Sequence, residues 1–398
     1  MNILFLTKEY NHKSLPNSGG TGVFISTLAK KLVELGHNVF VFSLSNQNHD
    51  VNDCGVIVKI KKKKLEKNHI FKLKKSLTRK FSFLQKWYYP VLKLELKEIA
   101  VELKKFIKKN KLIIDIIETH DFDGFSLYLD NKIPYVIRCH GSFSIFQKYF
   151  NFKNIIQHKL QWEKDAIQKS KNIITVSKYS QKINHELFEI DNSKLIYNGI
   201  NTDKFIFDKN VSVLPKSIFF VGNLTKEKGA DIAAEIFKKV ENIYPESRLH
   251  FIGIETDYKT KIIDYLEKNN LKNKVIFYGF MDSENLIHNL SKAEIVILPS
   301  RGENFSLTVL ELMSMSKCVV TSNIPSYSEL IINNQNGYIV NSIQDYVDTI
   351  KLIFDNKEKA KEIGFQARNT IINNFGIDKM VNQTIEYYQE VIENHKIS

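Results

Sequence analysis

Short apolar runs alternate with longer amphipathic segments along the whole chain. Short apolar runs are typical of buried parallel strands, and amphipathic segments are typical of the helices that cover them. The alternation therefore predicts an α/β fold built on parallel sheets. The expected strands are 3–7, 38–43, 56–60, 113–118, 135–138, 172–176 and 194–197 in the first half, and 217–222, 248–253, 274–278, 294–299 and 317–322 in the second.

The second series of strands begins after the loop 201–215, and each half starts with a strand, a glycine-bearing loop and a helix. A chain of 398 residues is long enough for two hydrophobic cores. We expect two Rossmann-like domains, residues 1–205 and 206–378, facing each other across a cleft. The last segment, 379–398, is expected to form a helix that packs back on the first domain. Ligands of such sheets bind beyond the carboxyl ends of the strands.

The net charge of +13 comes from one basic segment. From Lys59 to Lys111, nineteen lysines and arginines stand against four acidic residues, and the rest of the chain is nearly neutral. This distribution disfavours a nucleic-acid binder, whose basic surface is usually spread or repeated. Two interpretations stay open. The helix expected over 87–109 packs on its own domain, or it rests with the tract 61–80 on an anionic membrane surface.

Three distant cysteines, Cys54, Cys139 and Cys318, form no metal-binding pattern. The N-terminal sequence shows no secretory leader, and no apolar run reaches the roughly 18 residues of a membrane-spanning helix. We therefore expect a cytoplasmic protein, which the membrane interpretation would place on the inner face of the membrane.

The first candidate site is the segment NSGGTG at 17–22, which follows the first strand and opens a helix. Glycines such as Gly19 and Gly20 let backbone N–H groups approach a phosphate, and a helix N-terminus favours its charge. The segment is neither G-x-G-x-x-G nor a Walker A sequence, which disfavours dinucleotide oxidoreductases and P-loop enzymes. A flexible turn without a ligand is an equally good interpretation.

The second candidate site is the segment VGNLTKEKG at 221–229. Lys228 comes one residue before the glycine that opens a helix, where its ammonium can reach a phosphate held at the helix start. A solvated lysine in a polar loop is the alternative.

The third candidate site, PSRGENFSLTVLE at 299–311, contains two carboxylates that bracket a strand-to-helix turn. Glu303 lies in the expected loop and Glu311 in the helix that is expected to start near residue 306. A diphosphate would meet the N–H groups of Phe305, Ser306 and Leu307, and Glu311 would accept from two ribose hydroxyls. Two glutamates at this spacing also occur by chance.

The fourth candidate is His140, which directly follows an expected strand of the first domain. A neutral histidine that projects into the cleft can hydrogen-bond with a sugar hydroxyl. A core histidine bonded to backbone is the alternative.

In their order along the chain, these motifs resemble those of the GT-B retaining glycosyltransferases of family four, the glycosyl transferases group 1. The matching pieces are Gly19-Gly20, His140-Gly141, Val176-Ser177, 197–200, 221–229, the E-x7-E element 303–311, and 336–338. The resemblance implies an acceptor-binding first domain and a nucleotide-sugar-binding second domain. It also implies a retaining hexosyltransferase that needs no metal and no cofactor besides its nucleotide-sugar co-substrate.

The resemblance further implies roles for single residues. Glu311 would hold the donor ribose, Glu303 the donor sugar's hydroxyls, and Lys228 the diphosphate. The expected donor-binding residues are Gly19, Gly20, Asn223, Lys228, Phe305, Ser306, Leu307 and Glu311, and the expected catalytic residues are His140 and Glu303.

Two positions depart from the family's pattern. Asn223 stands where the family usually has arginine, which removes one of two cations near the phosphates. Ser306 stands where the family usually has glycine, and its side chain narrows the approach to the donor. Arg301 is a candidate to replace the missing charge.

The expected activity is transfer of a sugar from a nucleotide diphosphate, a UDP-sugar in the first place, to a glycan or lipid-linked acceptor. Bacterial surface polysaccharide or glycoconjugate synthesis is the expected setting. A UDP-sugar 2-epimerase of the same architecture and an inactive donor-binding relative are the alternatives.

Overall fold

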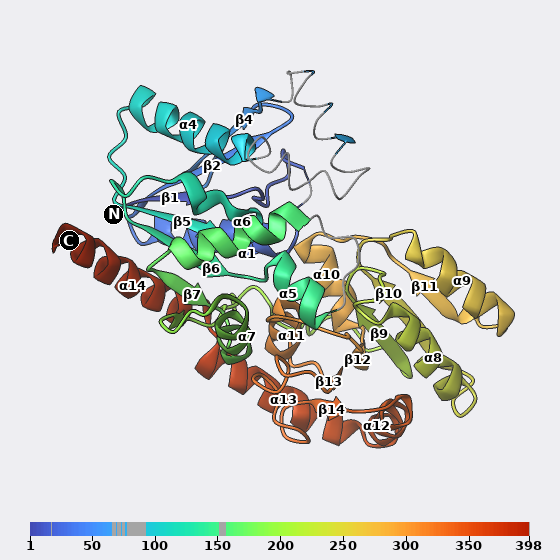
Figure 1. Ribbon diagram of the computed structural model, residues 1–398. Coiled ribbons are helices and arrows are strands. Elements are labelled where there is room, and N and C mark those ends of the chain that lie inside the picture. The colour runs from blue at the N-terminus through green and yellow to red at the C-terminus, as the bar shows by residue number, and fades with distance from the viewer. Residues whose placement is uncertain are drawn as a thin grey trace. The chain divides into compact units, whose positions relative to one another are not determined.

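The computed structural model describes residues 1–16, 18–65, 69, 73, 76–77, 93–150 and 157–397. The chain divides into two compact units, an N-terminal unit of Met1–Tyr197 with Val381–Ser398, and a C-terminal unit of Asn198–Met380. Each unit contains one sheet with helices packed on it (Figure 1). The predicted α/β class with two parallel-sheet domains is therefore confirmed.

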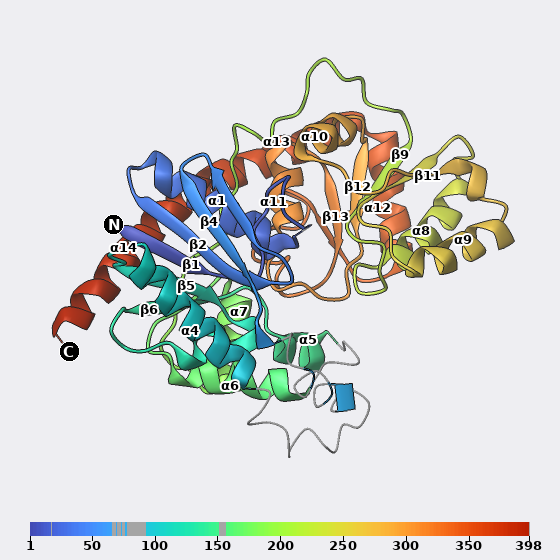
Figure 2. The ribbon, with the colours of Figure 1, turned by 90° about the horizontal axis from the view of Figure 1, so that it is seen from above.

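The sheet of the N-terminal unit has the strand order β3-β4-β2-β1-β5-β6-β7-β8. Its strands are β1 Asn2–Leu6, β2 Asn38–Ser45, β3 His49–Asp53, β4 Val56–Lys62, β5 Ile116–His120, β6 Tyr135–Cys139, β7 Ile173–Thr175 and β8 Lys194–Leu195. All neighbours pair in parallel except β3 with β4, and Figure 2 shows β4, β2, β1 and β5 side by side. The order changes direction between β1 and β5, which is where ligands of such sheets bind.

The helices of this unit pack on the sheet through apolar faces. They are α1 Gly20–Glu34, η3 Phe122–Tyr128, α4 Leu94–Lys109, α5 Phe143–Tyr149, α6 Gln157–Lys169 and α7 Lys178–Phe188. Gly36 follows α1 with φ of 82°, the left-handed conformation that glycine commonly supplies after a helix. Phe106 of α4 stacks on Phe42 of β2 at 5.2 Å between ring centroids, so α4 packs on its own unit. The first part of the predicted helix, 87–92, lies outside the described residues.

The last helix, α14 Ile377–Ile397, contributes buried contacts to the N-terminal unit. The hydroxyl of Tyr388 donates to Glu118 Oε2 at 2.5 Å, and Arg138 Nε donates to Glu118 Oε1 at 2.9 Å. Arg138 Nη2 also donates to Thr384 Oγ1 at 3.1 Å. This buried group connects α14 with β5 and β6.

The sheet of the C-terminal unit is parallel throughout, in the order β11-β10-β9-β12-β13-β14. Its strands are β9 Ser217–Val221, β10 Arg248–Ile252, β11 Val275–Phe277, β12 Ile295–Leu298, β13 Val319–Ser322 and β14 Tyr338–Val340. Its helices are α8 Ala230–Glu241, α9 Tyr258–Lys268, η4 Lys272–Lys274, α10 Ser283–Ser291, α11 Leu307–Ser314, α12 Ile343–Asp355 and α13 Lys357–Asn374. Here the order changes direction between β9 and β12. The two motif loops of this half follow those strands.

Two strands were not predicted, one because it is polar and one because it is short. β3 reads HDVND and exposes alternate polar residues at the antiparallel edge, and β14 has only three residues. The prediction for β5 was also three residues too early, because Ile113 belongs to the apolar run but is 77% exposed. In the described part of the chain, no helix combines the length and apolar character needed to cross a bilayer.

Candidate active site

Close backbone contacts in the C-terminal unit join the loop after β9 to the loop after β12. Gly229 has φ of 74°, and a Cβ on it would lie 2.0 Å from the carbonyl oxygen of Pro299. Only glycine fits there. The N–H of Arg301 donates to the carbonyl of Glu227 at 2.8 Å. These contacts place Lys228 beside the segment 299–306.

An ion pair links the two motif loops. Lys228 Nζ donates to Glu303 Oε1, which also accepts from Ser300 Oγ at 3.2 Å. The side chain of Lys228 is 35% exposed and that of Glu303 is 13% exposed, so a ligand can reach the ammonium. The structure thus brings together the predicted phosphate cation and the predicted acceptor for sugar hydroxyls.

Ser306 is the N-cap of α11, the helix that follows this loop. Its Oγ accepts from the N–H of Val309 at 3.4 Å, and the residue is buried. The next N–H groups, at Leu307 and Thr308, belong to the first helical turn, whose amides have no partners within the helix. Phe305 is buried, with its ring 6.2 Å from that of Phe375. Its side chain therefore packs inside the unit, which leaves its backbone as the part that could face a donor.

Tyr327 supports this loop, and sequence reasoning missed it. The tyrosine is buried, and its hydroxyl hydrogen-bonds with Ser300 and Ser306. Burial raises the pKa of Tyr327 well above its ordinary value, so the hydroxyl stays neutral. No local pattern marks Tyr327, because its partners lie more than twenty positions earlier in the chain.

Glu311 projects from α11 and is half-buried. Burial raises its pKa to about 7, and the positive charge of Lys204 partly opposes the shift. Lys204 Nζ itself donates to Ser283 Oγ at 2.8 Å. Glu311 therefore titrates near neutral pH. Its carboxylate form only accepts hydrogen bonds, whereas its protonated form can also donate one.

Arg301 is engaged with α8. Its Nη1 and Nη2 donate to Asp231 Oδ1 and Oδ2, each at 2.8 Å, and Nη1 also donates to the carbonyl of Lys226. The hydrogen bonds that Arg301 donates to Asp231 raise the pKa of Arg301. Asn223 is exposed. Because the bidentate pair directs the guanidinium toward Asp231, the structure disfavours Arg301 as a replacement for the charge missing at Asn223.

In the N-terminal unit, the glycine loop meets a carboxylate that the sequence analysis did not consider. The N–H of Gly19 donates to Glu9 Oε2 at 2.9 Å. Gly20 is the first residue of α1, and a Cβ there would meet no atom within 4 Å. Asn17, two positions before Gly19, lies outside the described residues. Glu9 thus binds one of the amides that the sequence assigns to an anionic ligand.

His140 follows β6 directly, as predicted. Its backbone N–H donates to Asp121 Oδ1 at 3.1 Å, and its ring meets Phe24 edge to face with centroids 4.6 Å apart. Burial and the positive charge of Arg138 hold the pKa of His140 well below its ordinary range. The ring is therefore neutral, the form that can both donate and accept a hydrogen bond.

Two buried carboxylates position the segment around His140, and sequence reasoning missed both. Asp121 accepts from the N–H of Gly141 at 3.0 Å, and Glu163 accepts from the N–H groups of Phe143 and Ser144 at 3.0 and 3.1 Å. Burial raises the pKa of Asp121 to about 7 and that of Glu163 to about 8. The position of Asp121 directly after a strand could have indicated it.

The described residues contain no group of three or more histidine, cysteine or acidic side chains placed to hold a metal ion. The three cysteines are free thiols, of which Cys54 is exposed and Cys139 and Cys318 are buried.

Comparison with known proteins gives consistent matches along the chain. Residues 18–204 match the family model described as Glycosyltransferase Family 4, and residues 201–370 match the one described as Glycosyl transferases group 1. An uncharacterized glycosyltransferase of Methanocaldococcus jannaschii is 28% identical over 287 residues, which cover 70% of this chain and 76% of that protein. The O-antigen biosynthesis glycosyltransferase WclY of Escherichia coli is 31% identical over 144 residues, which cover 34% of this chain and 39% of that protein.

Among solved structures, Anabaena HepE in complex with UDP-glucose matches with a TM-score of 0.74 at 16% sequence identity. The match covers 98% of this chain and all of that chain. The two proteins share a fold.

Proposed function

This chain belongs to the GT-B glycosyltransferases of the glycosyl transferases group 1, and from that premise we propose that it transfers a hexose from a UDP-sugar with retention of anomeric configuration. The proposed acceptor is a glycan or a lipid-linked saccharide of a bacterial surface polysaccharide or glycoconjugate. The UDP-glucose bound by HepE and the O-antigen role in the name of WclY support the donor and the setting.

The observation that carries the proposal is the Lys228–Glu303 ion pair at the start of α11. A diphosphate at this helix start would meet the first-turn N–H groups and the ammonium of Lys228. Glu303, released from the lysine, would then accept hydrogen bonds from hydroxyls of the transferred sugar. Glu311 would bind the ribose hydroxyls of the same donor.

In this proposal, Lys228 and the helix N-terminus stabilise the charge that develops on the departing diphosphate. This is work that a metal ion does in other transferases, so we propose a reaction without a metal. The acceptor hydroxyl attacks from the face that the diphosphate leaves, and a diphosphate oxygen takes its proton. The neutral ring of His140 would bind a hydroxyl of the transferred sugar and would not act as the base.

A donor panel tests the proposal. UDP-, GDP- and ADP-sugars are compared by thermal shift and by slow nucleotide release in EDTA, with wild type and Glu311→Ala. We expect stabilisation and nucleotide release with a UDP-sugar, and loss of both in the variant. The absence of any response to all donors would contradict the proposal. Conversion of the UDP-sugar to its epimer without an acceptor would instead identify a 2-epimerase.

A further inference from the structure

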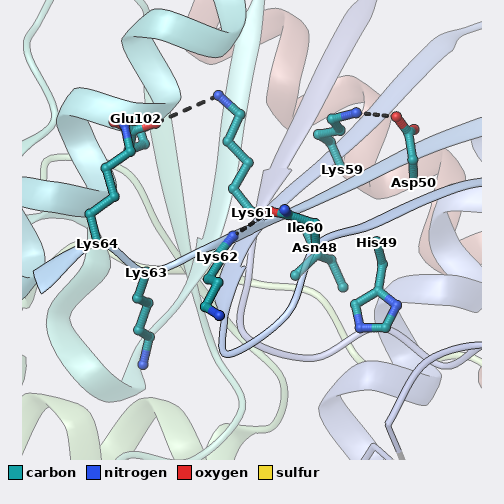
Figure 3. A pocket seen from close by; sticks show the side chains of 10 residues that line it. All are labelled: Asn48, His49, Asp50, Lys59, Ile60, Lys61, Lys62, Lys63, Lys64 and Glu102. Carbon is teal, nitrogen blue, oxygen red and sulfur yellow. Dashed lines mark hydrogen bonds and ion pairs between the residues drawn. The ribbon is translucent and has the colours of Figure 1, made fainter. Parts of the chain in front are cut away.

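A pocket of about 600 Å³ opens in the N-terminal unit where β4 leaves the sheet (Figure 3). Residues 48–50 and 59–64, at the facing ends of β3 and β4, line it together with Glu102 of α4. Five lysines and two carboxylates contribute to this lining, which leaves a surplus of three positive charges in one cavity. In the sequence, these lysines are part of the long basic segment from Lys59 to Lys111.

Carboxylates fix the position of some of these lysines. Lys59 pairs with Asp50, while Glu102 lies 2.8 Å from the ammonium of Lys64 and 3.7 Å from that of Lys61. Glu102 is only 5% exposed, and the stacking of Phe106 on Phe42 holds its helix against the sheet. One wall of the pocket is therefore preorganised.

Other lysines of the pocket extend away from this wall. Figure 3 shows the side chains of Lys62 and Lys63 directed away from Glu102. Lys62 has no ion-pair partner among the residues that the structure describes, and its backbone N–H donates to Asn48 Oδ1 at 2.7 Å. Ammonium groups gathered in this way repel one another, and an anion between them removes the repulsion.

A purely structural role explains this cluster poorly. Lysines are common on edge strands, where they prevent pairing with another chain. β3 pairs with β4 only up to Ile60, so this role would fit Lys61 and Lys62, which lie beyond that pairing, but it does not explain Lys63 and Lys64, which follow the strand. A solvated surface would also not require a buried carboxylate shared by Lys61, Lys64 and Lys105.

The pocket lies at the ligand-binding edge of the sheet. β4 runs parallel to β2, β1, β5 and β6, so its carboxyl end shares an edge with the ends that carry Asp121 and His140. Two strand spacings separate β4 from β1, which is about 10 Å. An elongated ligand can therefore reach from the pocket to the region between β1 and β5, where the sheet changes direction.

We propose that this pocket binds a phosphate or diphosphate group of the acceptor, separately from the donor's diphosphate. The inference rests on the proposed function, because it assigns the N-terminal unit to the acceptor. Ammonium groups bind phosphate oxygens as point charges. Lys62 and Lys63 supply two such ammonium groups beside the wall formed by Glu102. The phosphate belongs either to a lipid carrier or to a free phosphorylated saccharide.

The test uses inorganic pyrophosphate and vesicles as probes of the full chain, with the donor site saturated by UDP. Calorimetry measures pyrophosphate binding. Co-sedimentation compares phosphatidylcholine vesicles with and without polyprenyl diphosphate. In Lys62→Glu/Lys63→Glu, binding of pyrophosphate is expected to weaken by about tenfold or more. The matched control, Lys108→Glu/Lys109→Glu, changes exposed lysines at the far end of α4 by the same charge.

The outcomes separate the possibilities. Binding of both probes, lost in the pocket variant and kept in the control, supports a lipid diphosphate. Binding of pyrophosphate without vesicle binding supports a free phosphorylated acceptor. No binding by wild type, or an equal loss in both variants, overturns the pocket and leaves at most a general cationic surface. The thermal shift of wild type with UDP is the independent readout. If UDP does not stabilise wild type, the proposed function is contradicted, and this holds whether or not the pocket binds pyrophosphate.

Discussion

The ammonium of Lys228 donates to Oε1 of Glu303, although 75 positions separate the two residues in the sequence. A diphosphate at the start of α11 would compete with Glu303 for the ammonium of Lys228. Hydroxyls of the donor sugar would then replace that ammonium as hydrogen-bond donors to Glu303. The pair therefore compensates both charges, and a donor bound as proposed would separate them. Removal of either partner should affect binding and turnover differently.

Glu303→Gln should separate donor affinity from turnover. Without the carboxylate, Lys228 has no anionic competitor, so UDP should bind as tightly as to wild type or a few-fold more tightly. Turnover should fall by about a hundredfold, because hydroxyls of the transferred sugar lose a charged acceptor. Calorimetry with UDP and nucleotide release from the UDP-sugar measure the two quantities. A parallel loss of both would show that Glu303 only maintains the loop.

Ser306 allows a test of its capping role. Because alanine removes the oxygen that accepts from Val309 N–H, Ser306→Ala should lower the free energy of unfolding by about 1 kcal/mol. Ser306→Gly should lower it by only a few tenths, since glycine is also tolerated at an N-cap. Urea denaturation of both variants checks the difference. Equal stability of Ser306→Ala and wild type would mean that the hydroxyl does not stabilise α11.

Glu311 should make stability depend on pH in a defined window. The unfolded carboxyl ionises near its ordinary pKa of 4.5, whereas burial keeps the folded one protonated up to about pH 7. The free energy of unfolding therefore loses a contribution as pH rises from 4.5 to 7, and the loss is complete above 7. Glu311→Gln removes this loss, so it should match wild type near pH 4.5 and exceed it by about 1–3 kcal/mol above pH 7. A pH series of denaturation curves tests this, and a constant difference between the two proteins across the series would contradict it.

Asp121 should position the backbone after β6 without contributing to donor binding. Asp121→Ala leaves the buried N–H of Gly141 without its acceptor and removes one of the two acceptors of the His140 N–H, which should lower the free energy of unfolding by about 1–3 kcal/mol. Asp121→Asn retains an acceptor oxygen and should lose less. UDP affinity should be unchanged in both variants, because Lys228, Glu311 and the start of α11, which are proposed to bind UDP, lie in the C-terminal unit. A loss of UDP affinity in Asp121→Asn would assign Asp121 a role in donor binding.

The sequence predicted most of what regular patterns encode. Buried parallel strands are continuous apolar runs, so most strand segments and the restart at β9 were recognisable, whereas β3 was missed because its residues are polar. The segments of Lys228, Glu303 and His140 were also recognisable, because each contains a glycine and directly follows an apolar run. The supporting residues Tyr327, Asp121 and Glu163 were not predicted, because their roles depend on contacts between segments distant in the chain. For Arg301, the sequence showed an available cation but not the contact with Asp231 that occupies it.

The most direct test of the central claim is the binding of UDP in EDTA to wild type, Lys228→Ala and Lys238→Ala, measured by calorimetry. Lys238 is an exposed lysine on α8 outside the motif loops and serves as the matched control. We expect UDP to bind wild type and Lys238→Ala equally, and to bind Lys228→Ala about tenfold or more weakly, because one charge-assisted phosphate contact is lost. Equal affinity of all three proteins for UDP would contradict the assignment of Lys228 and the start of α11 as the donor diphosphate site.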